Sequence, residues 1–317
     1  MTDLLITDAL TTDAFKTDAT MAMKIITAPA KINLFLRITR IRGDGMHELD
    51  TAFAYTDLCD RLHLEPCREI EVTCSQPHLS GPHNLVHKIL AAFKGEFGIA
   101  QGLKLHIEKY IPEQAGLGGG SSDAASALLA ANRCWGVNAD VETLIRFAAP
   151  FGADIPCFLY GKASRARGIG EQLQDYHTAL PGQTLLLAKP HSGLSTAAVF
   201  QHFDRLYMAQ SGGTVDSTLT EPEGLDTIRR DSPALAENSL EASACYLNPD
   251  VSKLLVYLRQ YADIAWMSGS GSVCIALLDD PTQAAQVAAK LKAQQLAAWT
   301  HIGKISGTHP LNNIIGT

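Results

Sequence analysis

Residues 111–125 read Ile-Pro-Glu-Gln-Ala-Gly-Leu-Gly-Gly-Gly-Ser-Ser-Asp-Ala-Ala, a glycine run that leads through two serines into an alanine-rich segment. Glycine lets the backbone approach a ligand closely, and the free N–H groups at a helix start attract anions. The chain lacks Gly-x-x-x-x-Gly-Lys-Ser/Thr, and the run lacks the Gly-x-Gly-x-x-Gly spacing of dinucleotide sites. A flexible linker would not lie between Pro112 and an amphipathic helix, so the run predicts a phosphate site of a third kind.

Two charged side chains fall inside apolar segments. Lys31 follows Ala-Pro-Ala in an alternating segment, and Asn33 shares its face. Asp154 lies between Ala153 and Ile155, where a carboxylate needs either a partner or a task. Taken singly, Lys31 is compatible with a solvated strand face and Asp154 with a helix cap. If the two meet, the carboxylate stays ionised and can orient a hydroxyl group or accept its proton.

Two further segments are candidates for ligand binding. His47 follows an Arg-Gly-Asp-Gly turn at 42–45, and Ser-Gly-Ser-Gly-Ser occupies 268–272. A lone histidine is more often a surface residue than a ligand. Glycines interleaved with hydroxyl groups suit an anion, and they equally suit an ordinary turn between two strands. The local sequence leaves both alternatives open for each segment.

The elements that must position these residues follow from hydrophobic periodicity. Alternation predicts strands at 24–41, 48–55, 61–65, 103–109, 163–172, 185–188, 264–267 and 273–278. Helices are expected at 84–97, 140–149, 249–261 and 282–298, and another can open at Pro156. A further helix should follow the glycine run, with Ser122 as its N-cap and Asp123 in its first turn. The order predicts an antiparallel meander followed by a two-layer α+β unit.

The composition limits the class of protein. The 317 residues favour two domains, with a boundary near residue 180. Seven scattered cysteines without a Cys-x-x-Cys pair indicate a reduced cytoplasmic chain without zinc. The net charge of −7 argues against a nucleic-acid partner. The absence of an 18-residue apolar stretch and of a signal-peptide pattern argues against a membrane or secreted protein.

The N-terminal segment differs from the rest of the chain. Thr-Asp-Ala recurs at 7–9, 12–14 and 17–19 without a core pattern, so residues 1–23 are predicted to be a disordered extension. Met21 or Met23 is then the expected natural start. A second polar segment, residues 209–235, is rich in Ser, Gly, Thr and acids and predicts a long surface connection.

Several of these segments together resemble the motifs of the GHMP kinases, small-molecule kinases named for galactokinase, homoserine kinase, mevalonate kinase and phosphomevalonate kinase. The matching segments are Pro-Ala-Lys-Ile-Asn-Leu at 29–34, the glycine run, and Gly-Ser-Gly at 269–271. Asp-Gly-Met-His-Glu-Leu at 44–49 and Gly-Ala-Asp-Ile-Pro-Cys-Phe at 152–158 resemble one branch, which acts in the non-mevalonate (methylerythritol phosphate) route to isoprenoid precursors. The resemblance implies a two-domain α+β fold, with a ribosomal protein S5 domain 2-like nucleotide-binding domain at 24–180 and a ferredoxin-like substrate domain at 181–317.

The resemblance also implies a reaction in the cleft between those domains. ATP, with Mg²⁺, would phosphorylate the C2 hydroxyl of 4-diphosphocytidyl-2-C-methyl-D-erythritol, with Asp154 as the base and Lys31 beside it. No residue is assigned to the metal. The residues implied at ATP are Pro112, Gly116, Leu117, Gly118, Gly119, Gly120, Ser121, Ser122 and Asn84. The residues implied at the acceptor are Asn33, His47, Phe200 as a stacking partner for cytosine, Gly269, Ser270 and Gly271.

Two residues depart from the family pattern. Met46 stands where members often carry an aromatic residue before the histidine, which weakens the expected stacking on cytosine. Asp123 stands where some members carry asparagine, and a carboxylate repels nearby phosphates.

Three other functions compete with this hypothesis. Another GHMP kinase, such as homoserine kinase, is disfavoured by His47 after the Gly-Asp-Gly turn. A catalytically silent ATP-binding relative is disfavoured by the presence of both Lys31 and Asp154. An RNA-binding role, which an S5-like fold suggests, is disfavoured by the acidic balance.

Overall fold

The structure is a computed structural model that describes residues 24–211 and 227–311. The predicted N-terminal extension, its two candidate start residues and much of the predicted 209–235 connection lie outside the described residues. Within the described ranges, no helix is long and apolar enough to cross a membrane.

Two long antiparallel strands run through the centre of the fold. Strand β1 (Lys24–Ile41) pairs with β2 (His47–Cys67) from Lys24 opposite Leu64 to Ile41 opposite His47. The prediction of two separate strands at 48–55 and 61–65 is wrong, because β2 runs through both without a break. Strand β4 (Gly102–Glu108) pairs with the far half of β2, and β3 (Glu71–Cys74) lies parallel to β4. Strand β5 (Ser164–Arg167) pairs with β2 near its start and with β6 (Gln172–Asp175).

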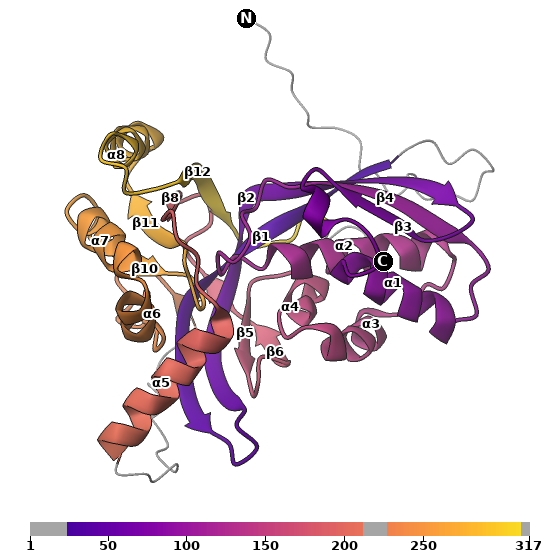
Figure 1. Ribbon diagram of the computed structural model, residues 1–317, viewed down its shortest axis with the longest axis horizontal. Coiled ribbons are helices and arrows are strands. Elements are labelled where there is room, and N and C mark those ends of the chain that lie inside the picture. The colour runs from indigo at the N-terminus through magenta and orange to yellow at the C-terminus, as the bar shows by residue number, and fades with distance from the viewer. Residues whose placement is uncertain (1–23, 212–226, 312–317) are drawn as a thin grey trace, which may run out of the picture.

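Four helices cover one face of this sheet (Figure 1). They are α1 (Leu85–Glu96), α2 (Gly119–Cys134), α3 (Val141–Ala148) and α4 (Ile155–Tyr160), with short 3₁₀ turns at Pro77–Leu79 and Ala149–Phe151. Leu62 and Ile107 from the sheet pack against Phe93 and Leu128 from the helices in a common core. Helix α2 is buried from Ser122 to Asn132, so most of its length packs inside the domain, whereas its first three residues are more exposed.

The C-terminal half is a second α+β unit. Strand β8 (Thr184–Lys189) lies between β11 (Cys274–Leu278) and β12 (Trp299–Ser306), and β10 (Ile264–Met267) pairs with β11. The helices of this half are α5 (Thr196–Ser211), α6 (Glu241–Leu247), α7 (Pro249–Leu258) and α8 (Pro281–Ala293). The order β-α-β-β-α-β with β8 and β11 central is ferredoxin-like, as the resemblance to the GHMP kinases implies. A small parallel pair joins β7 (His177–Thr178) to β9 (Thr227–Ile228).

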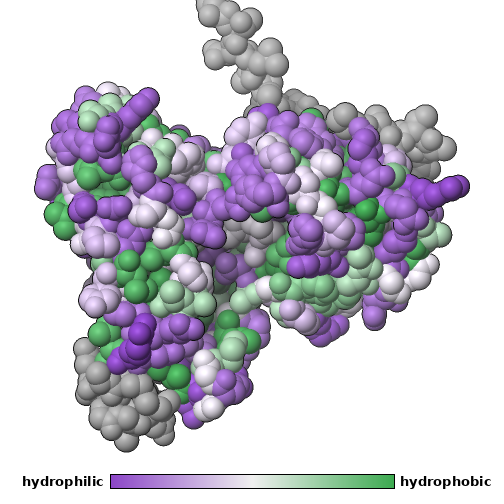
Figure 2. Space-filling view, viewed as in Figure 1, coloured by the Kyte–Doolittle hydropathy of each residue, from purple (hydrophilic) through white to green (hydrophobic). Residues whose placement is uncertain are grey.

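The two halves are joined through both long strands. Strand β12 pairs with β2 at Ile305 opposite Thr56, so one continuous sheet links the halves. On the other side, Leu36 of β1 donates its N–H to the Glu237 carbonyl, and the Trp266 indole donates to the Asn33 carbonyl over 2.7 Å. The surface is hollowed between the halves (Figure 2), and the residues that could do chemistry lie on the walls of this hollow.

Candidate active site

A pocket of about 900 Å³ occupies the hollow between the halves. Its walls come from β1, β2, the segment before α2, and the 268–272 turn of the C-terminal half. The predicted site residues that line it are Lys31, Asn33, His47, Asn84, Pro112, Gly116, Leu117, Gly118, Gly119, Gly120, Ser121, Asp154, Phe200, Gly269, Ser270 and Gly271. Ser122 does not line it.

The glycine loop, residues 116–120, ends at the first turn of α2. Gly118 is the N-cap of α2 in the left-handed conformation, with φ of 70°. A Cβ on Gly118 would lie 3.0 Å from the Phe158 ring and 3.1 Å from Lys31 Cγ. The N-terminus of a 16-residue helix therefore opens into the pocket, and the first N–H groups of an α-helix have no partner within the helix, which is the geometry that binds anions.

The helix start corrects two expectations. Because α2 begins at Gly119, Ser122 lies inside the helix, is fully buried, and is not its N-cap. Asp123 is likewise past the first turn. Glycine at the cap position lets the chain enter the helix through a left-handed residue, and this geometry prevailed over the capping preference of serine.

The 268–272 turn packs against the glycine loop. Ser268 Oγ donates to the Gly116 carbonyl over 3.0 Å, and the Val273 N–H donates to the Ala115 carbonyl over 3.1 Å. A Cβ on Gly116 would lie 2.1 Å from the Ser268 carbonyl oxygen. The turn therefore does more than connect β10 to β11, because it packs directly against the glycine loop and lines the pocket with it.

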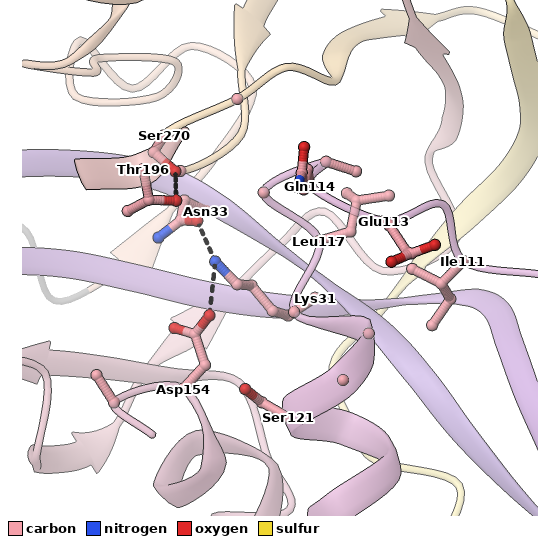
Figure 3. Close-up of a pocket in the computed structure, with 18 of the residues that line it drawn as sticks. Lys31, Asn33, Ile111, Glu113, Gln114, Leu117, Ser121, Asp154, Thr196 and Ser270 are labelled. Carbon is pink, nitrogen blue, oxygen red and sulfur yellow. Dashed lines mark hydrogen bonds and ion pairs between the residues drawn. The ribbon is translucent and has the colours of Figure 1, made fainter. Parts of the chain in front are cut away.

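Two polar residues that the sequence did not single out hold this wall in place. Asn238 donates to the carbonyls of Met267 and Gly269, each over 2.8 Å. Thr196, at the start of α5, shares a 2.8 Å hydrogen bond with Ser270 (Figure 3). Single polar residues such as these resemble ordinary surface positions, so no local signal distinguishes them.

Lys31 and Asp154 meet at the mouth of the glycine loop (Figure 3). Lys31 Nζ lies 3.8 Å from Asp154 Oδ2 and 2.7 Å from Asn33 Oδ1, while the Lys31 N–H donates to the Leu117 carbonyl over 3.0 Å. The Lys31 side chain is 5% exposed, so it does not lie on a solvated face. Asp154 is the N-cap of α4, but its carboxylate makes no capping bond and is 37% exposed. Its carboxylate is therefore available to a ligand.

At the opposite end of the pocket, the structure brings together His47 and Phe200, two residues that the resemblance implies at the acceptor. The rings of His47 and Phe200 lie 4.6 Å apart and are tilted by 51°. His47 Nε2 lies 2.6 Å from Asp204 Oδ1, a partner in α5 that the sequence did not indicate. His47 is therefore a constrained residue rather than a surface one. Met46 also lines this end and is 46% exposed.

Asn84 has a structural task as well as a place on the pocket wall. Its side chain accepts from the Val86 N–H over 2.8 Å, capping α1, and donates to the Leu79 carbonyl over 2.7 Å. An amide NH₂ group has two hydrogens, so one remains for a ligand.

A buried charged cluster lies beneath the glycine loop. Lys109 Nζ contacts Asp60 and lies 2.8 Å from Asp123 Oδ2. Asp60 Oδ1 also accepts from the backbone N–H groups of Tyr110 and Ile111. Although burial disfavours its charge, the two carboxylates raise the pKa of Lys109. Burial raises the pKa of Asp123 to about 7 despite this lysine, so the Asp123 carboxyl group takes up a proton near neutral pH.

We expect this cluster to make stability depend on pH. The pKa of Asp123 is raised above the unfolded value of 3.8, so its stabilising contribution is present below pH 3.8 and is lost as pH rises through about 7. Asparagine imitates the protonated acid, so Asp123→Asn should raise the melting temperature relative to wild type more at pH 8 than at pH 5. Each kcal/mol corresponds to about 2–4 °C for a domain of 150–250 residues. Thermal unfolding at both pH values measures this difference.

The matched control is Asp140→Asn, which changes an exposed helix cap. The backbone hydrogen bond from Thr143 lowers the pKa of Asp140, so this control should show the same difference from wild type at pH 5 and pH 8. If the difference in melting temperature between Asp123→Asn and wild type stays constant or shrinks from pH 5 to pH 8, the pKa of Asp123 is not raised in the folded state.

Comparison with known proteins places this geometry in a family. Residues 84–162 match the GHMP kinases N terminal domain, and residues 223–297 match GHMP kinases C terminal. The chain is 34% identical over 293 residues to the 4-diphosphocytidyl-2-C-methyl-D-erythritol kinase of Bordetella bronchiseptica, covering 92% of this chain and 93% of the relative. It is 37% identical over 263 residues to the enzyme of that name from Delftia acidovorans, covering 80% and 86%.

Solved structures agree with these relatives. A crystal structure of 4-(cytidine 5'-diphospho)-2C-methyl-D-erythritol kinase superposes with a TM-score of 0.71 at 31% identity, covering 90% of this chain and all of that one. The Methanococcus jannaschii mevalonate kinase superposes with a TM-score of 0.65 at 13% identity, covering 90% and 99%. The second likeness shows the shared fold alone.

Proposed function

The chain belongs to the GHMP kinase family, and from this premise we propose that it uses ATP to phosphorylate the C2 hydroxyl of 4-diphosphocytidyl-2-C-methyl-D-erythritol, a step toward isoprenoid precursors. The names of relatives that are 34–37% identical over at least four fifths of the chain support this substrate. The observation that carries the proposal is the meeting of Lys31 and Asp154 at the start of α2, 3.8 Å apart.

We assign the ATP phosphates to the glycine loop. Residues 116–121 surround the N-terminus of α2, where the helix dipole and the unpaired N–H groups favour negative charge. Pro112 and Asn84 line the part of the pocket beyond the loop, which suits the nucleoside. Ser122 makes no direct contact with the phosphates in this arrangement, because its side chain is buried away from the pocket and its N–H donates to the Gly118 carbonyl over 2.9 Å.

The transfer step then requires positioning and neutralised charge more than covalent chemistry by the protein. The C2 oxygen forms a bond to the γ-phosphorus, and the bond between that phosphorus and the β,γ-bridging oxygen breaks, so ADP leaves. Asp154 orients the hydroxyl and receives its proton, a role that typically contributes about 10²–10⁴-fold. Lys31 Nζ lies beside the Asp154 carboxylate and stabilises the negative charge on the transferred phosphoryl group.

The phosphate end of the pocket has donors suited to Mg²⁺. Asp123 Oδ1 is buried without a hydrogen-bond partner in the described part of the chain, and Asp123 lines the pocket together with Ser121 and Asp154. Carboxylate and hydroxyl oxygens are the ligands Mg²⁺ prefers, and one or two carboxylates with substrate phosphates suffice to hold it. Mg²⁺ bound there would neutralise charge on the phosphates, and Asp123 would release its proton in order to hold the ion.

We place the acceptor at the other end of the pocket. His47 and Phe200 form a ring pair there that suits the cytosine, and Asn33 with residues 269–271 lines the path between this pair and Lys31. Met46 offers a flexible apolar surface rather than a second ring.

We also propose a location for the activity. All seven cysteines are free thiols, which suits the reducing cytoplasm, and the proposal requires neither a nucleic-acid nor a membrane partner.

A panel of acceptors tests the proposal. ADP release in a coupled assay should depend on 4-diphosphocytidyl-2-C-methyl-D-erythritol and should not respond to homoserine or mevalonate. Release driven by homoserine alone would assign a different kinase activity. ATP binding without acceptor-dependent release across the panel would indicate a catalytically silent relative.

A further inference from the structure

A line of three buried polar side chains leads from β2 to the proposed catalytic pair. Thr51 Oγ1 donates to the Phe35 carbonyl over 2.6 Å and accepts from Asn33 Nδ2 over 2.8 Å. Asn33 Oδ1 in turn accepts from Lys31 Nζ over 2.7 Å. Thr51, Asn33 and Lys31 are 1%, 2% and 4% exposed, so water does not replace these contacts.

The register of the two long strands explains this alignment. Asn33 lies opposite Phe53, and an irregularity between Asn33 and Phe35 then brings Leu36 opposite Thr51. Side chains two residues apart on a strand point to the same face, so Thr51 and Phe53 both face Asn33. The Phe53 ring lies 5.3 Å from Lys31 Nζ, which places the ammonium between ring and amide.

The donors and acceptors permit one orientation of the Asn33 amide. A threonine hydroxyl has one hydrogen, and the Phe35 carbonyl can only accept it. Thr51 therefore offers only lone pairs to Asn33, which must turn its NH₂ group toward Thr51 and its carbonyl oxygen toward Lys31. An ammonium has only hydrogens to offer, so Lys31 requires the same orientation.

We propose that Thr51 is a positioning residue for phosphoryl transfer, because its hydroxyl sets the Asn33 amide and thereby holds Lys31 Nζ toward Asp154. This inference rests on the proposed function of Lys31 and Asp154. Without the hydroxyl, the NH₂ group of Asn33 loses its partner, and the amide can turn its hydrogens toward Lys31. The ammonium would then lose its 2.7 Å acceptor and its fixed place beside the glycine loop.

The backbone of Asn33 has its own contacts, which do not involve Thr51. Its backbone N–H is bound by Ser268 Oγ over 3.3 Å and its carbonyl by the Trp266 indole over 2.7 Å. Loss of the Thr51 hydroxyl removes its bond to the Phe35 carbonyl of β1, but the two backbone contacts of Asn33 remain and should keep the strand in place.

The test compares Thr51→Val, which removes the hydroxyl at nearly constant shape, with Thr51→Ser, which keeps it. Thr51→Val should lower kcat by about tenfold to a hundredfold, the cost of one charge-linked hydrogen bond, with the KM for ATP within about threefold. Thr51→Ser should restore kcat to within about threefold of wild type. Thr56→Val is the matched control, since it removes a second buried hydroxyl from β2 outside the pocket, and its kcat should be unchanged.

A double-mutant cycle separates positioning from general damage. If Thr51 acts through the amide, Thr51→Val should lower kcat no further in an Asn33→Ala background. An equal loss in both backgrounds, or an unchanged kcat in Thr51→Val alone, overturns the inference.

A structural readout keeps the inference testable if the proposed function fails. Absence of acceptor-dependent ADP release in the wild type would refute the proposed function, but it would not refute the positioning of Lys31 by Thr51. Crystal structures of wild type and Thr51→Val then decide. Displacement of Lys31 Nζ from Asn33 Oδ1 in the variant supports the inference, and the wild-type contact retained in the variant refutes it.

Discussion

Replacing Asp154 by asparagine should lower turnover by about 10²–10⁴-fold while ATP affinity stays within a few-fold of wild type. Asparagine keeps the shape of the side chain but cannot receive the proton of the C2 hydroxyl, and it no longer pairs with Lys31. The carboxylate makes no helix-capping bond and is 37% exposed, so the fold does not depend on it. Steady-state kinetics with both substrates, together with calorimetric titration of ATP, measures the two effects separately.

Asp250→Asn is a suitable control for this variant. Asp250 is a carboxylate in the first turn of α7, outside the pocket, with its side chain 45% exposed. Its replacement should leave kcat unchanged. Near-normal turnover in Asp154→Asn would remove Asp154 from the chemistry, even if Asp250→Asn behaved as expected.

Replacing Gly116 by alanine should weaken ATP binding by at least about tenfold and lower the melting temperature. Gly116 has φ of 75°, where a Cβ is strained, and that Cβ would lie 2.1 Å from the Ser268 carbonyl oxygen. Backbone on both sides must move to relieve the contact, because neither partner is a flexible side chain. The glycine loop and the 268–272 turn would separate, and the pocket would lose the wall that they share.

Gly95→Ala provides the comparison. Gly95 lies within α1, and a Cβ there would meet nothing within 4 Å. Alanine at this position should raise stability by about 0.5–1 kcal/mol and leave ATP affinity unchanged. Wild-type ATP affinity in Gly116→Ala would show that close contact between the two loops is not needed to hold the phosphates.

The periodic parts of the chain could be predicted from the sequence. Lys31 and Asn33 share a face because side chains alternate along a strand, and the hydrogen bond between them is a direct result. The glycine run likewise indicated that a helix follows it, although α2 begins at Gly119 and not after Ser122. In both cases the information lies within about ten residues.

The errors arose where tertiary contacts overrode local patterns. Asp57 and Asp60 lie in the gap between the two predicted strands at 48–55 and 61–65. In the structure, Asp57 accepts a hydrogen bond from the Lys304 N–H of β12, and Asp60 forms an ion pair with Lys109. Both acids have partners far away in the sequence, so the strand continues through them.

The missed residues share one property. Thr51, Asp204 and Asn238 each act by contacting a residue at least 18 positions away, and each looks locally like an ordinary polar residue. The pairing of Lys31 with Asp154 has the same character, since it depends on the packing of α4 beside α2 and the sheet. Residue types alone left that pairing conditional, and only the resemblance of several motifs together implied it.

The identity of the phosphorylated oxygen tests the account most directly. The methyl branch makes the C2 hydroxyl of 4-diphosphocytidyl-2-C-methyl-D-erythritol a tertiary alcohol, so the carbon of its phosphate ester carries no hydrogen. After incubation with ATP, ³¹P NMR should show one new phosphomonoester for each ADP, without three-bond coupling to a proton. A proton-coupled ester, or ADP without any new ester, would contradict the proposed transfer.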